Sequence, residues 1–303
     1  MIKSGITWAV WTLLLLSLCV SCEKIALDDD TEKASVEGKT KLRVTVSELS
    51  QTPFDNASSL QIPDSRASVP ITDICGRLSI AVFKDGVKED VVAQKKGDEN
   101  YGTATFSLSE GVHTLVIIGH NGEGTATLSS PQKVTFASNQ VSDTFYACEE
   151  VTVGADEQQL SFDLKRAVSM FRLEVTDTVP STVKQLRFYY TGGSSTFDPS
   201  SGFGCVNSRQ TVNLTVKPEM KVFEVYTFPH SLTDVLKITV TAINSSNEEL
   251  FERVFEEVPV TLNCITTYRG KFFQGFEGAV VRYEQTYAIT ANPEWNDSTI
   301  VDF

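Results

Sequence analysis

Apolar and polar residues alternate along most of the chain after residue 40, with the two-residue period that is typical of β-strands. In KLRVTVSEL (41–49), Leu42, Val44 and Val46 fall on one face and polar residues on the other. Similar alternation recurs in RLSIAVF (77–83), TATFSL (103–108), VHTLVIIGH (112–120), QKVTF (132–136), QQLSFDLK (158–165), SMFRLEV (169–175), KQLRFYY (184–190), TVNLTV (211–216), KVFEVYTF (221–228), LKITVTAI (236–243), ELFERVF (250–256), TYRGKFF (267–273) and YEQTYAIT (283–290). Turn-forming stretches such as KDG and HNGEG separate these segments, and no helical period of comparable length occurs. The pattern predicts an all-β protein built from sandwiches of short strands.

The stretch GADEQ (154–158) is the clearest break between two groups of predicted strands. Roughly six or seven predicted strands lie on each side of it, which is enough for one sandwich each. We therefore predict two tandem β-sandwich domains, residues 36–156 and 157–303. One larger sandwich is the alternative.

The first residues have the layout of an export signal. Lys3 precedes an apolar block that ends at Val20, and small residues follow it, as in a secretory signal peptide. The end of this block resembles the bacterial lipoprotein box, in which a cysteine becomes the acylated first residue of the mature protein. Cys22 fits this position because the small Ser21 precedes it, although Cys19 stands where the box prefers an aliphatic residue. We expect a signal peptide at 1–21 and a lipid anchor on Cys22; an ordinary secreted protein is the alternative.

Composition and charge limit the kinds of molecule that the chain is expected to bind. Residues 22–35 are charged and small, and are expected to form a flexible tether between the lipid and the first domain. The net charge of the chain is −13, which disfavours binding to nucleic acid. Four further cysteines, Cys75, Cys148, Cys205 and Cys264, allow three disulfide pairings. Pairing within each domain, Cys75 with Cys148 and Cys205 with Cys264, is favoured about equally with four free thiols.

Sequence motifs for catalysis are absent. His113 and His120 fall in one predicted strand on opposite faces, and His230 follows a proline in a predicted loop. The chain has no GxSxG, HExxH or Gly-rich phosphate motif, and its cysteines lack metal-site spacing. We therefore predict no enzyme, no cofactor and no metal. The alternative function is a glycan-binding surface lipoprotein, with a loop-borne site lined by Tyr189, Tyr190, Phe197 and Phe203.

Several local patterns resemble the fimbrillin superfamily of Bacteroidales type V pili. They are DSRASVPITDICGRLSIAVFKDG (64–86), SFDLKRAVSMFRLEVTDTVP (161–180) and TTYRGKFF (266–273). The first is similar to the family's cleavage loop and the strand that follows it, and the second to the strand pair that opens its second domain. The resemblance spans most of residues 40–290 and implies two transthyretin-like, Greek-key sandwiches.

The resemblance also implies an assembly mechanism. A protease that cuts after Arg or Lys would cleave the loop after the first strand, here between Arg66 and Ala67. The lipid and the first strand, marked by Leu42, Val44 and Val46, would then leave. An extended segment of another subunit would fill the vacated groove, which is donor-strand complementation, a form of β-augmentation.

A terminal segment is expected to supply the donor strand. Tyr287, Ile289 and Ala291 fall on one face of such a segment, with a shorter run after Pro293. A terminal strand packed in its own domain explains the same pattern. The implied partners are other pilus subunits in a homopolymer or heteropolymer, the outer membrane through the lipid, and a receptor on a host or bacterial surface. A shaft, tip or anchor role, at the cell surface or in the fimbrium, stays open.

Overall fold

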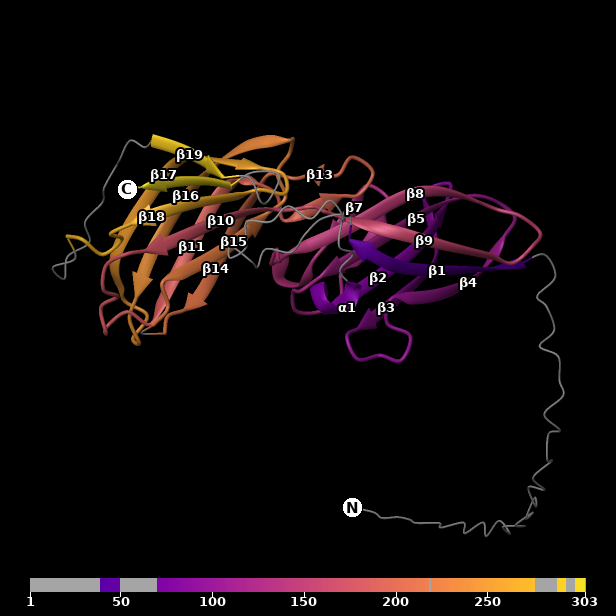
Figure 1. The fold of residues 1–303 in the computed structure, drawn as a ribbon, viewed down its shortest axis with the longest axis horizontal. Helices are drawn as coiled ribbons and strands as arrows, with labels where there is room; N and C mark the ends of the chain where they lie inside the picture. Colours follow the sequence, from indigo (N-terminus) through magenta and orange to yellow (C-terminus); the bar gives the residue numbers. More distant parts are fainter. Residues whose placement is uncertain (1–38, 50–69, 218, 276–287, 293–297, 303) are drawn as a thin grey trace, which may run out of the picture. The chain divides into compact units, whose positions relative to one another are not determined.

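The computed structural model describes residues 39–49, 70–217, 219–275, 288–292 and 298–302. The chain divides into two units, Met1–Glu37 and Gly38–Phe303, and all described residues belong to the second. Strands make up nearly all of its regular structure, which confirms the predicted all-β class (Figure 1). The helical elements are the single turns α1 (Ile71–Ile74) and η1 (Ala137–Asn139).

A seven-stranded sheet forms the first sandwich. Its order is β3 (Val87–Lys95), β2 (Arg77–Lys84), β5 (Gly111–His120), β8 (Thr144–Val153), β9 (Gln158–Arg166), β1 (Lys39–Leu49) and β4 (Thr103–Ser109). All neighbouring pairs are antiparallel except β1 and β9, which run parallel. The β8 and β9 strands share a short register, Phe145 with Arg166 and Tyr146 with Lys165, so this pairing joins the two halves of the sheet.

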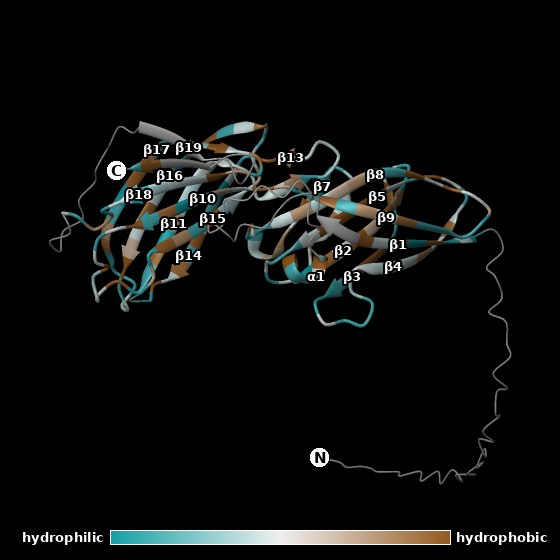
Figure 2. Ribbon diagram, in the orientation of Figure 1, coloured by the Kyte–Doolittle hydropathy of each residue, from teal (hydrophilic) through white to brown (hydrophobic). Residues whose placement is uncertain are grey.

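Both faces of β2 and β5 are buried, which explains their nearly continuous apolar sequences. One face packs with β1, β4 and β9 around Leu42, Val44, Phe106, Ile117 and Phe162. The opposite face packs against a second cluster that includes Val116, Ile118, Val134, Phe136 and Phe197. In Figure 2, hydrophobic and hydrophilic residues follow one another along the other strands, which is the alternation seen in the sequence.

The second sandwich consists of two sheets. The five-stranded sheet has the order β15 (Val222–Thr227), β10 (Ser169–Val175), β18 (Ile265–Gly270), β20 (Ser298–Asp302) and β19 (Ala288–Asn292). The four-stranded sheet has the order β14 (Ser208–Thr215), β11 (Gln185–Gly193), β16 (Thr233–Ile243) and β17 (Glu249–Thr261). Phe171, Phe188, Phe255 and Tyr268 interlock in the core between them, with Val301 at its C-terminal end.

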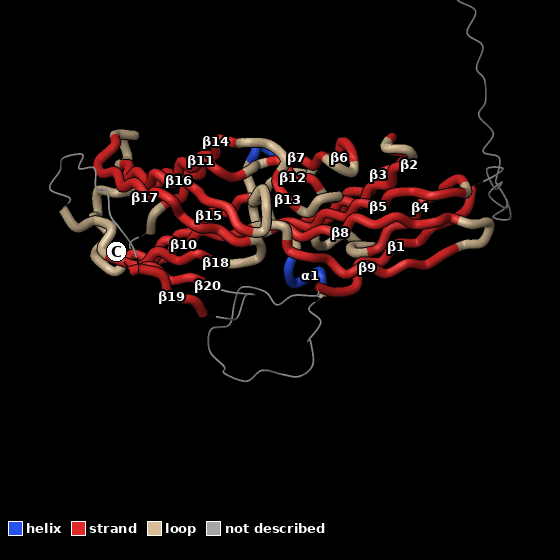
Figure 3. Tube along the Cα trace, turned by 90° about the horizontal axis from the view of Figure 1, so that it is seen from above, coloured by secondary structure: helices blue, strands red, loops and turns tan. Residues whose placement is uncertain are grey.

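A small sheet joins the two sandwiches. Its order is β13 (Phe203–Gly204), β12 (Thr196–Asp198), β7 (Lys133–Thr135) and β6 (Thr127–Ser130), so strands from both halves of the chain pair directly (Figure 3). The ring of Phe197 stacks on Phe228 and meets Tyr146 edge-on. Gly202 has a positive φ and a Cβ there would collide with the Tyr146 hydroxyl, so only glycine allows this close approach.

A buried arginine fastens the same junction. Arg166 donates to both carboxylate oxygens of Asp143, at 2.8 and 3.1 Å, and to Asn263 at 3.1 Å. Its guanidinium also lies 4.7 Å from the centre of the Phe145 ring. Asp143 and Phe145 belong to the first half of the chain and Asn263 to the second, so Arg166 links the end of β9 to the turn before β18.

The fold differs from the sequence prediction at the boundary between the two sandwiches and in several strands. The expected boundary at 156/157 assigns β9 to the second domain, whereas β9 pairs with β1 in the first sheet. The β3 and β8 strands were not predicted, because neither shows regular alternation; β3 is largely exposed and Glu149 and Glu150 interrupt β8. The glycine-containing stretches GGSS (192–195) and SGFG (201–204) also contribute partly to strands, β11 and β13.

Candidate functional site

The position of β1 is the candidate site, and we call it the β1 slot: the place between β9 and β4 that β1 fills (Figure 1). The β1 strand runs parallel to β9, from Leu42 opposite Gln158 to Leu49 opposite Leu164. It runs antiparallel to β4, from Lys39 opposite Ser109 to Thr45 opposite Thr103. Among the described residues, β1 is the only strand that pairs with β4. The slot therefore has two backbone edges, one of each polarity.

The inward face of β1 is fully part of the first core. Leu42 and Val44 are 0% exposed and Val46 is 4% exposed. Thr40, at the start of the same face, donates its hydroxyl hydrogen to the carbonyl oxygen of Ala155 at 3.3 Å. Burial of three aliphatic side chains contributes roughly 5–9 kcal/mol, counted against a fully extended chain. This placement agrees with the strand predicted from Leu42, Val44 and Val46.

The outward face of β1 is basic. Lys39, Lys41 and Arg43 are exposed on it and alternate with the buried residues. Their partners across β4 are Ser109, Ser107 and Thr105, which carry hydroxyl groups but no charge. The strand therefore presents a row of cations in a chain whose net charge is −13.

The end of β1 is held by a bulge. The register with β9 shifts between Val46 and Glu48, and the Val46 N–H bonds the carbonyl oxygen of Gly102 at 2.8 Å. Gly102 has φ +89°, a left-handed conformation that glycine adopts without strain. The bulge fixes which residues of β1 face the core.

The structure also fixes the chain where it re-enters the fold, at α1. Ile71 and Ile74 of α1 are buried in the first core. The Tyr101 hydroxyl donates to the carbonyl oxygen of Cys75 at 2.5 Å, and burial raises the pKa of Tyr101. The Asn121 side chain donates to the carbonyl oxygen of Ile74 at 2.6 Å and accepts the N–H of Gly76 at 2.8 Å. Residues 74–76 are thus held by hydrogen bonds that do not involve β1, while Ile71 and Ile74 share the first core with β1.

Several predicted site residues lie outside the described part of the chain. These are Cys22, Arg66, Ala67 and Tyr287. Ile289 and Ala291 lie in β19, an end strand of the five-stranded sheet. The β19 strand pairs antiparallel with β20, and β20 runs parallel to β18 (Figure 3). The C-terminal segment is therefore packed in its own domain here, which is the alternative that the sequence left open.

The cysteines and histidines do not form a site. Cys75, Cys148, Cys205 and Cys264 form no disulfide with one another, and the favoured pairing of Cys75 with Cys148 is wrong because Cys75 packs in the first core while Cys148 packs against the second cluster. The pairing of Cys205 with Cys264 is also wrong. His113 and His120 face these two clusters separately, as predicted from their spacing.

The predicted aromatic glycan site does not form either. Tyr190 and Phe197 are 0% exposed, and they pack in the second core and at the junction respectively. The Tyr190 hydroxyl donates to the carbonyl oxygen of Tyr226 at 2.8 Å. Tyr189 is 39% exposed, so it shares no exposed surface with the buried Tyr190 and Phe197. A shared aromatic platform is therefore excluded for this set.

In residues 39–49, 70–217, 219–275 and the two short C-terminal strands, no group of three or more His, Cys, Asp or Glu side chains could hold a metal ion. Within the same part of the chain, no helix has the length and apolar character to cross a membrane.

Comparison with known proteins gives a family. Residues 125–301 match the family of unknown function DUF6562, more than half of the chain. The chain belongs to the DUF6562 family. The DUF6562 match includes β9, one wall of the β1 slot, but not β1 itself. No curated protein matches the sequence.

Solved structures similar to this DUF6562 chain come from Bacteroidales. They include a candidate adhesin from Bacteroides ovatus (12% identity, 72% of this chain and 82% of that chain, TM-score 0.43), the fimbrial anchor protein Mfa2 from Porphyromonas gingivalis (12% identity, 71% and 81%, TM-score 0.38) and a fimbrial assembly protein from Parabacteroides distasonis (10% identity, 87% and 98%, TM-score 0.40). These neighbours are proteins of adhesion and fimbriae. Since the TM-scores are below 0.5, the function proposed below rests on the chain's own residues.

Proposed function

We propose that this chain is a fimbrial subunit, or an accessory or anchor lipoprotein of a fimbria, and that it assembles by exchange of β1 for a strand of another subunit. The observation that carries the proposal is the position of β1: an N-terminal strand that pairs on both sides and buries Leu42, Val44 and Val46 in the core. Residues 50–69, with Arg66 among them, separate it from the rest of the fold.

Loss of β1 would leave the slot between β9 and β4 empty. Both β9 and β4 would lose a row of backbone hydrogen bonds, and the apolar side chains around Phe106 and Phe162 would be uncovered. Exposed strand edges with apolar neighbours bind extended segments readily. A strand of the same polarity and the same alternation would restore both sets of contacts, which is β-augmentation.

The chain is suited to a single cut. Arg66 is the only lysine or arginine in residues 50–69. Cleavage after Arg66 would allow residues 22–66 to leave, and with them β1 and the acylated Cys22. The contacts of Tyr101 and Asn121 with residues 74–76 would keep α1 and β2 in place, since none of them involves β1. Before the cut, Cys22 would hold the chain at the outer membrane.

The decisive experiment follows the N-terminus of the full chain. Treatment with an Arg-specific protease should give a new N-terminus at Ala67 by mass spectrometry, followed by SDS-resistant multimers. Arg66→Ala should prevent both. Lys96→Ala, which removes an exposed cation from another turn, should change neither. A cut chain that keeps residues 22–66 bound and stays monomeric would contradict the exchange.

Native protein isolated from cells distinguishes the roles of the subunit. Diacylglycerol on Cys22 with an intact Arg66 would assign the anchor role, because the lipid would remain with the assembled protein. A native N-terminus at Ala67 would assign a matured shaft or tip subunit.

A further inference from the structure

A pocket lies at the start of β1, where β3 and β4 approach each other. It has a volume of about 240 Å³. Its lining residues come from β1, β3 and β4: Lys39, Glu89, Asp90, Ser107, Leu108 and Ser109. The first residue of β1 is thus a wall of a pocket whose other walls belong to strands that would remain after β1 leaves.

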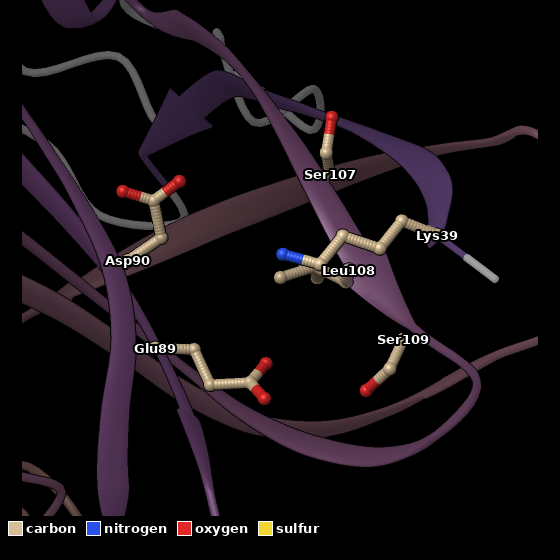
Figure 4. Close-up of a pocket in the computed structure, with 6 residues that line it drawn as sticks. All are labelled: Lys39, Glu89, Asp90, Ser107, Leu108 and Ser109. Carbon is tan, nitrogen blue, oxygen red and sulfur yellow. The ribbon is translucent and has the colours of Figure 1, made fainter. Parts of the chain in front are cut away.

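The charges in this pocket are arranged around Lys39. Figure 4 shows the Lys39 side chain extending over Leu108 towards the strand that carries Glu89 and Asp90. Glu89 already has a partner of its own, because its carboxylate lies 3.0 Å from Nε2 of His113, a side chain that is 0% exposed. Asp90 accepts the N–H of Val91 at 2.8 Å and also lines the pocket, and in Figure 4 the Lys39 ammonium lies on the side of the pocket that faces the strand of Glu89 and Asp90.

The remaining groups balance one another. The Nδ1 atom of His113 lies 3.1 Å from the carbonyl oxygen of Gly111. Lys84 donates to the Ser109 hydroxyl at 2.7 Å and to the carbonyl oxygen of Glu110 at 3.1 Å, so its ammonium is already bound at the β4 side. Departure of Lys39 would therefore remove the one lysine that lines the pocket beside Glu89 and Asp90.

We propose that this pocket selects the strand that fills the β1 slot, and that it favours a strand with Lys or Arg at the position of Lys39, three residues before the first apolar residue that enters the core. This inference rests on the proposed exchange of β1 and specifies its partner. The core side of the slot accepts any strand with suitable apolar alternation, whereas the pocket distinguishes strands by charge.

The sequence of the chain's own C-terminal segment does not meet this requirement. If Tyr287, Ile289 and Ala291 replaced Leu42, Val44 and Val46, Glu284 would take the place of Lys39. A third carboxylate would then stand beside Glu89 and Asp90, and a tyrosine would have to fit the space of a buried leucine. The partner is therefore an extended segment of a different subunit that carries a cation at this position.

A peptide-exchange experiment tests the selection. The full chain is produced with a site-specific protease sequence after Arg66, cut, and incubated with a labelled peptide KTKLRVTVSEL, the sequence of β1. The Lys39→Glu version of the peptide should bind about threefold to tenfold more weakly, because it places a further carboxylate beside the exposed Glu89 and Asp90. On the Asp90→Lys chain the order should reverse, with the Lys39→Glu peptide bound at least as well as the original.

The matched control is Lys41→Glu in the same peptide. Lys41 lies on the same outward face of β1 but does not line the pocket. Its binding should not depend on the residue at position 90. The Lys39 effect should also shrink in 1 M salt, because screening weakens exposed charge pairs.

The outcomes separate the two proposals. If the unmodified β1 peptide does not enter the cut chain at all, the proposed exchange is wrong. If it enters but the unmodified peptide and its Lys39→Glu version bind equally well to both chains, the exchange stands and the selection by the pocket is wrong. The uncut chain gives a second measurement: in urea unfolding, Lys39→Glu combined with Asp90→Lys should be more stable than the two single changes predict together, and strict additivity would overturn the pairing of these residues.

Discussion

The first and last strands of the described fold, β1 and β20, occupy the same kind of position. Each lies between a parallel neighbour and an antiparallel end strand: β1 between β9 and β4, and β20 between β18 and β19. They differ in length and in what they hold. The β1 strand has eleven residues and secures β4, whose Ala104, Phe106 and Leu108 are buried, whereas β20 has five residues.

Because of this difference, the first sandwich depends on β1 more than the second sandwich depends on β20. Removal of β1 would take away the only described strand partner of β4 and part of the first core, so the first sandwich needs an occupant in the slot. Removal of β20 would take Val301 out of the second core and expose one edge of β18, while the aromatic cluster around Phe171 and Tyr268 would remain covered by both sheets. The proposed exchange at β1 would therefore be coupled to folding of the whole first sandwich.

A buried charge in each strand should give the largest contrast. Val44→Asp places an unpaired carboxylate in the first core and should lower the free energy of unfolding by more than about 4 kcal/mol. Val301→Asp should cost less, because β19 and β20 can detach locally and carry the charge into water. Urea unfolding and hydrogen exchange check both. Equal losses for the two variants would show that β20 is as essential as β1.

A milder substitution measures how much one buried side chain of β1 contributes to the free energy of unfolding. Leu42→Ala keeps the strand but removes most of a fully buried side chain, and should lower the free energy of unfolding by about 3 kcal/mol. In the cut chain the same change should also speed the release of residues 22–66. If thermal unfolding of Leu42→Ala matches the unmodified protein, β1 contributes less to the first core than its burial implies.

Acid should weaken the first sandwich before the second. Burial, aided by the charge of Arg77, lowers the pKa of His120 to about 4, while its Nδ1 accepts the N–H of Gly122. In the unfolded chain the imidazole takes up a proton below pH about 6.5, but in the folded chain only near pH 4. Stability is therefore lost as the pH falls through this window, by about 2 kcal/mol between pH 7 and pH 5.

Urea unfolding at the two pH values measures this loss, and His120→Gln should nearly abolish it. Hydrogen exchange should place the acid-induced opening in β5 and β8 rather than in β16 and β17. A His120→Gln protein with an unchanged pH response would assign the loss to other groups.

The sequence predicted the strands whose apolar residues alternate with polar ones or form a continuous run, and it missed strands that have neither pattern. Leu42, Val44 and Val46 stand out because water lies on one side of β1 and the core on the other. The β3 strand is exposed along most of its length, so its sequence carries no period. The local sequence pattern could not predict the pairing of β1 with β9 either, because partners such as Leu42 and Gln158 lie far apart in the sequence. The pocket at Lys39 depends on that same long-range arrangement, and neither charge nor spacing indicated it.

The smallest expected effect tests whether the cations of β1 serve stability at all. Arg43→Ala removes an exposed side chain between the uncharged partners Thr105 and Gln159, and should change the free energy of unfolding by less than about 0.5 kcal/mol. The matched variant in the second sandwich is Arg172→Ala, which breaks a 2.7 Å ion pair with Glu224 and should cost about 0.5–1 kcal/mol. Urea unfolding of both proteins at low and high salt gives the comparison. A cost for Arg43→Ala above that of Arg172→Ala would mean that the basic face of β1 stabilises the fold. A negligible cost would mean that this cation of β1 does not stabilise the fold. That result would agree with a role of the β1 charges in strand recognition, which is the role proposed for Lys39.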